Sequence, residues 1–289
     1  MDEIAPTGRT QQPETLSSGN IVLSEKEQDA LEKITGTRWT KYGPVAMAAL
    51  SALPWVGSLF SIAGTIASAK SQDEVNQVMF LWVQEHQEKL KALAFTLNAI
   101  FARFDSFGDQ IKERIESEEY RSLVRKAFSE WDRAETAQKR EMLRKLISNA
   151  GGTAIVDDDK VRMFIHWIEK FDELHFKVMA TIQGSTNKGR DSITRREIWS
   201  SIYGEEMPRD DSSEANLYKL LIHDLGTGEV ISQYRESDLM GRIKIRDRGT
   251  SSTPGLQKSP FDDKEPYVLT PLGDEFVRYV MEDLALQIE

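Results

Sequence analysis

Hydrophobic positions along most of this chain recur at three- and four-residue steps, which is the period of amphipathic helices. The longest such pattern runs from residue 71 to residue 115, with charged residues between the apolar ones. Gly108 lies inside the pattern and weakens a helix relative to Ala by about 1 kcal/mol. We therefore expect one long helix that bends or breaks between Ser106 and Asp109.

The middle of the chain continues the helical pattern. Residues 117–152 predict two helices, the second ended by a Gly-Gly pair, and residues 161–183 predict one helix that is apolar over most of its circumference. On that helix His166 and His175 lie nine residues apart and so face opposite sides, which excludes a shared metal ion.

The pattern changes after residues 184–192, which resemble a linker. Thr194 and Glu197 have the spacing of a capping box at the start of a helix, and a second helix follows over residues 213–227. Three stretches of period-two, β-branched sequence come next, and a helix closes the chain. The order of these elements is that of a winged helix-turn-helix, with residues 247–266 as a long wing tip.

One segment departs from this amphipathic pattern. Residues 42–69, here called the apolar segment, form a 28-residue run without a charged side chain. As one helix it would reach roughly 40 Å, but Pro54 divides it into halves of roughly 20 Å, shorter than the ~30 Å hydrocarbon core of a bilayer. Three interpretations stay open: membrane insertion, a buried helical hairpin and a protein-binding surface. The residues central to all three are Leu53, Pro54, Trp55, Val56, Gly57, Leu59, Phe60 and Ile62.

Composition limits the partners. The formal charge of −10 disfavours a general binder of nucleic acid or of anionic membranes. The chain has no cysteine, which excludes disulfides and thiolate chemistry and favours the cytoplasm. Residues 1–23 are polar and lack the pattern of a signal peptide, so we interpret them as a disordered leader.

Candidate chemistry is sparse. No phosphate-binding loop, nucleophile elbow or zinc-protease motif occurs, so we predict no catalytic residue, metal site, cofactor or small-molecule substrate. Residues 190–289 carry 13 basic and 20 acidic residues, a net charge of −7. One local exception is a period-two stripe of cations that would grip phosphates or form a solvated strand face: Arg242, Lys244, Arg246 and Arg248.

Two short motifs carry a resemblance to a known family. The first is K-R-x-x-x-x-x-L-I-x-N, from Lys139 to Asn149, and the second is L-T-x-L-G-x-x-F, from Leu269 to Phe276. With the Gly- and Ala-rich apolar segment before them, they resemble the bacterial Abi-alpha family, which is implicated in abortive infection. The resemblance implies a host-defence protein that acts at the inner membrane, and it supplies no catalytic residues.

Together these observations predict a mainly α protein: a long-helix bundle over residues 24–183, then a winged-helix-like α+β domain over residues 184–289. The leading hypothesis is a non-enzymatic antiphage effector that conceals the apolar segment and uses the winged module to bind a protein partner or to self-associate. It would be cytoplasmic and associate with the inner membrane when triggered. The alternatives are a DNA-binding regulator and a scaffold that oligomerises through its long helix.

Overall fold

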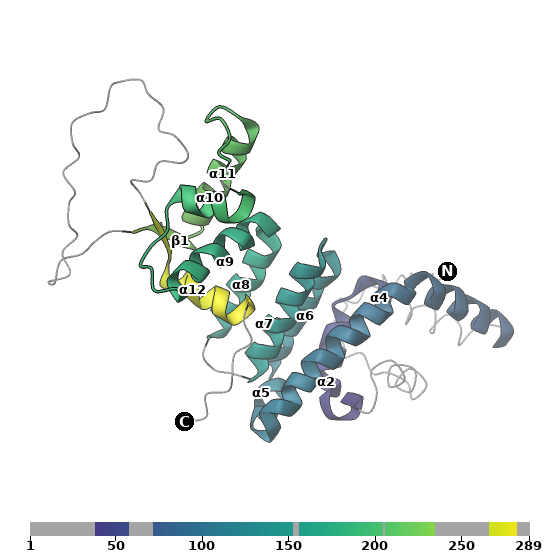
Figure 1. The fold of residues 1–289 in the computed structure, drawn as a ribbon. Helices are drawn as coiled ribbons and strands as arrows, with labels where there is room; N and C mark the ends of the chain where they lie inside the picture. Colours follow the sequence, from purple (N-terminus) through teal and green to yellow (C-terminus); the bar gives the residue numbers. More distant parts are fainter. Residues whose placement is uncertain (1–37, 58–71, 153–155, 205, 235–265, 282–289) are drawn as a thin grey trace, which may run out of the picture.

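The computed structural model describes residues 38–57, 72–152, 156–204, 206–234 and 266–281, and this part of the chain is mostly helical with one small sheet (Figure 1). The first group of elements is α2 (Arg38–Ser51), α4 (Gln72–Phe107), the 3₁₀ turn η1 (Gly108–Ile111), α5 (Lys112–Glu116), α6 (Glu118–Arg133), α7 (Ala137–Gly152) and α8 (Asp158–Lys170). The second group is α9 (Glu173–Asn187), α10 (Arg195–Tyr203), α11 (Ser213–Thr227), β1 (Ile231–Gln233), β2 (Tyr267–Leu269), α12 (Pro271–Phe276) and the π-helical turn η2 (Val277–Met281).

The helices form a bundle that joins the small sheet through a continuous core. Helix α2 packs on α6, α4 packs on α7, and α8 packs on both α6 and α7. Helices α9 to α12 and β1 lie together at the other end of the molecule (Figure 1). One hydrophobic cluster extends from α2 to η2, so the apolar stripes predicted from the sequence face a shared interior.

The long helix has the predicted break. Helix α4 ends at Phe107, and Gly108 has a φ of +74°, which is a conformation that glycine adopts at little cost. A 3₁₀ turn and the short α5 follow. The two helices predicted over residues 117–152 are also present, and Ser117 caps the first by accepting a hydrogen bond from the backbone N–H of Tyr120.

The prediction of one helix over residues 161–183 is wrong. The chain is extended at Phe171, with ψ at 141°, and two helices, α8 and α9, meet there. The reason is a local capping signal: Asp172 caps α9, and its backbone N–H donates to Nδ1 of His175 at 3.1 Å. Helix α9 continues to Asn187, four residues into the segment expected to be a linker.

The sheet consists of two short antiparallel strands. Ile231 pairs with Leu269, and Ile193 forms a further bridge with Tyr267 on the other edge of β2. Helix α12 follows β2 directly, and a Cβ on Gly273 would lie 2.1 Å from the carbonyl oxygen of Val230, so only glycine allows this close approach. The third predicted strand, over residues 241–246, lies outside the described residues.

Candidate functional site

The described half of the apolar segment, residues 42–57, packs against α4 and α6. It is helical except for a kink at Tyr42 and a break at residues 52–53, and one face of it is buried throughout. The apolar side chains on that face are at most 9% exposed; they are Tyr42, Val45, Ala46, Ala48, Ala49, Leu50, Leu53, Trp55 and Val56. In the described residues this segment is therefore part of the core.

The predicted interruption at Pro54 is present. Helix α2 ends at Ser51, and helical backbone resumes at Pro54, whose fixed φ and missing N–H suit the first position of a helix. Leu53 is buried, whereas Pro54 and Gly57 are exposed. Of the central residues predicted from the sequence, Leu59, Phe60 and Ile62 lie outside the described residues, as does the second arm of the expected hairpin.

A carboxylate on α4 fastens the first end of the apolar segment. Asp105 accepts hydrogen bonds from the Tyr42 hydroxyl at 2.7 Å, from Lys41 Nζ at 3.0 Å and from Arg38 Nε at 2.9 Å. The hydrogen bond from Tyr42, followed by the interactions with the two cations, lowers the pKa of the Asp105 carboxyl. The Tyr42 ring also stacks on Phe101 at 5.1 Å, so this contact combines packing with charge. We call it the Asp105 clamp.

A second contact fastens the other end. Trp55 Nε1 donates to the carboxylate of Asp132, at the end of α6, over 2.8 Å. Its ring stacks on Trp82 and His86 of α4, with centroids 6.1 and 5.5 Å away. Lys89 Nζ lies 5.8 Å from the Trp55 ring centroid and 3.5 Å from the Asp132 carboxylate. We call this group the Trp55 clamp; it holds the apolar segment to two helices at once.

Neither clamp is predicted by the sequence analysis. Asp105 and Asp132 are ordinary acidic residues in helices rich in charge, and no motif singles them out. Only Trp55 indicates such a contact from the sequence, because a buried Trp usually needs a hydrogen-bond partner for its N–H. That requirement does not say which of the many carboxylates supplies the partner.

The two motifs behind the family resemblance meet in space. Asn149 of α7 is buried and donates from Nδ2 to the backbone oxygen of Tyr279 at 2.7 Å. Lys145 Nζ donates to the backbone oxygen of Met281 at 3.1 Å. Because Tyr279 and Met281 belong to η2, which directly follows the second motif, the two motifs together attach the C-terminal elements to the bundle. Their role here is structural.

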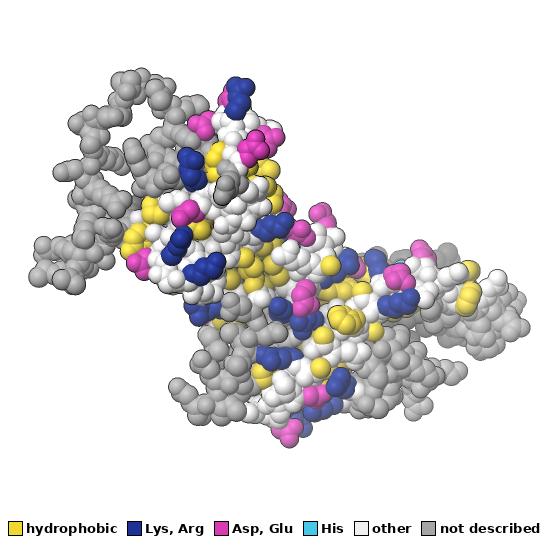
Figure 2. Space-filling view, viewed as in Figure 1, with side chains coloured by type: hydrophobic (Ala, Val, Ile, Leu, Met, Phe, Trp, Pro, Cys, Tyr) yellow, Lys and Arg dark blue, Asp and Glu magenta, His cyan; other side chains and the backbone are white. Residues whose placement is uncertain are grey.

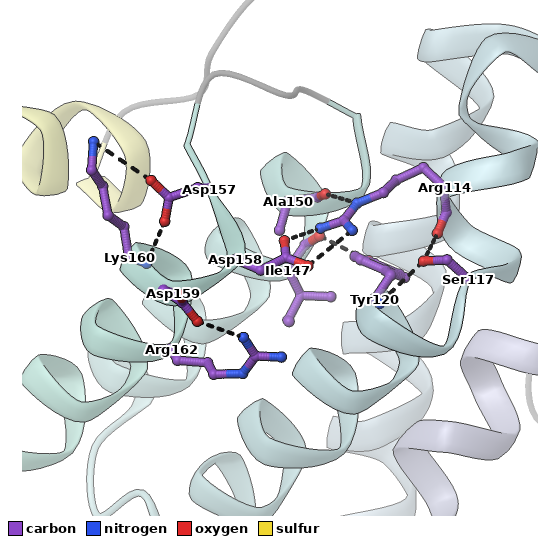
Figure 3. Close-up of polar contacts among 10 residues, drawn as sticks. All are labelled: Arg114, Ser117, Tyr120, Ile147, Ala150, Asp157, Asp158, Asp159, Lys160 and Arg162. Atoms are coloured by element: carbon purple, nitrogen blue, oxygen red, sulfur yellow. Dashed lines mark hydrogen bonds and ion pairs between the residues drawn. The ribbon is translucent and has the colours of Figure 1, made fainter.

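A polar network joins the helices next to this attachment (Figure 3). Arg114 of α5 forms an ion pair with Asp158 at the start of α8 and donates from Nε to the Ala150 oxygen at 3.1 Å. The buried hydroxyl of Tyr120 donates to the Ile147 oxygen at 2.9 Å. The network provides hydrogen-bond donors to carbonyl groups in the last turns of α7 and joins α5, α6 and α8 to that helix.

The histidines occupy two different environments. His166 is exposed and lies 3.2 Å from the Glu169 carboxylate, three residues along the same helix. His175 is buried, and burial lowers its pKa against the opposing effects of Asp172 and Asp224. Among the described residues no three His, Asp or Glu side chains come together as metal ligands.

Helix α11 directly precedes the two-stranded sheet in the chain, and the third strand that a winged helix requires falls outside the described residues. Helix α11 exposes Asn216, Lys219 and His223, together with two apolar side chains, Leu217 at 46% and Leu220 at 53% exposed. The predicted cation stripe from Arg242 to Arg248 lies outside the described residues. The exposed face of α11 therefore mixes polar and apolar side chains. It carries less positive charge than binding in a DNA groove usually requires.

Comparison with protein-family models, with curated proteins and with solved structures gives no match. Among the described helices, none combines the length and the apolar character that crossing a membrane requires.

Proposed function

We propose that this protein is a non-enzymatic bacterial antiphage effector of the abortive-infection type, in which the helical bundle conceals the apolar segment until a trigger releases it to act on the membrane. The observation that supports the proposal is the burial of residues 42–57 beneath two clamps. The resemblance of the chain to the Abi-alpha family supplies the biological setting. The C-terminal elements serve as a winged-helix-like module for partner binding or oligomerisation.

The placement of the clamps suits a concealed segment. Both clamps bind through side chains at the two ends of residues 42–57, and between them the apolar side chains of the segment are buried in the described core. Exposing a large apolar side chain to water costs about 1.5–3 kcal/mol. Spontaneous release is therefore rare, and an event that breaks a clamp makes the release more frequent.

The test is dye leakage from vesicles of mixed phosphatidylethanolamine and phosphatidylglycerol, with purified full-length protein. We expect little leakage from the wild type and increased leakage from the double variant Trp55→Ala, Asp132→Ala. Circular dichroism must show that this variant keeps its helical content. Absence of leakage from the folded double variant would refute the proposal.

A charge placed in the apolar segment provides the matched control. Gly57 is exposed, and apart from its neighbours along the chain no atom of the described residues lies within 4 Å of the position of an added Cβ. In the clamp-free background we expect Gly57→Glu to suppress leakage, because a charged residue is costly in the bilayer core, while Gly57→Gln suppresses it much less. Equal leakage from both variants would remove the segment from the mechanism.

Self-association through α4 is a compatible part of this proposal. The N-terminal part of α4 extends beyond α2 and α6, and hydrophobic side chains reach the surface along the helix (Figures 1 and 2). Phe80, Leu81 and Phe95 are 67, 56 and 72% exposed. Light scattering on the purified chain should give a mass above the monomer, reduced by Phe80→Ser with Leu81→Ser; a monomeric wild type would contradict this part.

The second candidate is a DNA-binding regulator, suggested by the predicted order of elements and by the exposed Asn216 and Lys219 of α11, although the low positive charge of that helix counts against it. It requires the cations at residues 242–248 to contact phosphates. A gel-shift assay at low salt should then show binding that falls steeply with added salt and is lost when all four cations are replaced by Ala. Absence of binding, or binding unchanged in that variant, excludes this candidate.

A further inference from the structure

The exposed face of α4 differs from those of the other described helices because several large apolar side chains lie on it. Phe80, Leu81 and Phe95 are 67, 56 and 72% exposed, and no other helix in the described part of the chain exposes three such residues. Hydrophobic side chains are visible at the surface along this helix (Figure 2). Single apolar residues on a surface are ordinary, but a set of them on one helix is typical of a contact surface.

The spacing of the exposed residues is that of a coiled coil. Leu81, Glu88 and Phe95 follow one another at seven-residue intervals, so they form one line along α4, and about 21 Å separates its two apolar ends. Four exposed residues around Leu81 stand at positions i, i+3, i+4 and i+7, which is the spacing of a hole that receives a side chain from a facing helix. We call these residues the α4 hole; they are Gln77, Phe80, Leu81 and Gln84.

We infer that a second copy of this chain packs antiparallel against this face of α4, about a two-fold axis near Glu88. In that register Phe95 of each protomer enters the α4 hole of the other, because Phe95 and the centre of the hole lie at nearly equal distances on opposite sides of Glu88. The two apolar layers are then equal, each with one copy of Phe95, Phe80 and Leu81. A parallel pair would instead place both copies of Phe95 in one layer and the other four side chains in another.

The charged residues between the two apolar layers favour the same orientation. Lys91 Nζ lies 2.8 Å from the Glu88 carboxylate of its own chain. In the antiparallel pair the two Glu88 carboxylates lie near the axis, where the lysines offset their repulsion, and each Lys91 lies beside the partner's Gln84. In a parallel pair each Lys91 would lie beside the partner's Lys91. The antiparallel pair therefore separates the two lysines.

Crosslinking tests the orientation of the two helices. The inference rests on the self-association proposed for α4, and the chain has no cysteine of its own, so a single introduced cysteine reports on one position. In the full-length protein a short bismaleimide should join Glu88→Cys protomers into a covalent dimer, because residue 88 lies next to its equivalent at the axis. Gln77→Cys protomers should stay unlinked, because their two cysteines lie about 33 Å apart along the helix axes.

Substitutions on the same face test which side chains form the contact. Phe95→Ser should weaken the dimer at least about tenfold, measured by sedimentation over a range of protein concentrations. Lys91→Glu should weaken it too, and added salt should reduce that effect, because four negative charges then surround the axis. The matched control is Leu220→Ser on α11, which removes an apolar side chain that is 53% exposed and should leave the dimer unchanged.

Three results would overturn the inference. A monomeric wild type would remove self-association and the antiparallel pair together. Crosslinking of Gln77→Cys protomers would leave self-association in place and indicate a parallel pair. Equal dissociation constants for Phe95→Ser and Leu220→Ser would place the contact elsewhere on the molecule. Failure of the vesicle-leakage test would leave the antiparallel pair unaffected, because none of these measurements uses a membrane.

Discussion

The Trp55 clamp makes a quantitative prediction about how the apolar segment is held. The hydrogen bond from Trp55 to Asp132 measures 2.8 Å, and the Trp55 residue is only 9% exposed. A hydrogen bond to a charged group contributes about 1.5–3 kcal/mol. The ion pair between Lys89 and Asp132 adds little, since the Lys89 side chain is 55% exposed and exposed pairs contribute about 0–1 kcal/mol.

A double-mutant cycle isolates this hydrogen bond. Trp55→Phe keeps an aromatic ring but removes the N–H donor, and Asp132→Ala removes the acceptor. The ring area lost at Trp55 is the same with and without Asp132, so it cancels, and we expect a coupling free energy of about 1.5–3 kcal/mol. Urea unfolding of the four full-length proteins, followed by circular dichroism, supplies the free energies.

The control for Trp55→Phe is the same substitution at Trp131. Trp131 is 3% exposed, but its Nε1 has no hydrogen-bond partner among the described residues. Trp131→Phe therefore removes the same atoms from a buried ring without breaking a hydrogen bond, and we expect it to cost less than Trp55→Phe. A coupling below about 0.5 kcal/mol, which is within the error of additivity, would refute the clamp. Equal costs for the two Trp→Phe variants would do the same.

Three other predictions concern the stability of the helices and strands outside the two clamps. Gly273→Ala places a Cβ against the Val230 carbonyl and should destabilise the protein by about 1–3 kcal/mol. Gly184→Ala, in open space on α9, should stabilise the protein by up to about 1 kcal/mol. The melting temperatures of the two variants should therefore shift in opposite directions. His175 has a lowered pKa, so the unfolded chain binds more protons, and stability falls as pH drops below about 6.5. Urea unfolding at pH 7.5 and 5.5 should show a smaller loss of unfolding free energy in His175→Gln than in the wild type. An equal loss in the two proteins would contradict the prediction. Asn149→Ala should cost about 1–3 kcal/mol and speed proteolysis of the C-terminal elements; an unchanged cleavage rate would count against their attachment through η2.

Much of the fold could be predicted because its determinants are local. Helix period, the break at Gly108 and the capping box at Thr194 all depend on residues within a few positions of one another. Local patterns can also mislead: the apolar pattern over residues 161–183 is continuous through Phe171 and hides the capping signal that begins at Asp172. Periodicity shows which side chains are buried, but a buried stripe can cross a break between two helices.

What the sequence by itself determined is most of the helices and the exceptional apolar segment, because spacing and composition can be seen in a single stretch of chain. Only the tertiary structure decided that residues 42–57 are buried and which side chains hold them. Tyr42 and Asp105 are separated by 63 residues, and Trp55 and Asp132 by 77. Contacts at such separations depend on how helices pack, and among many acidic residues the packing alone selects the two that meet the apolar segment.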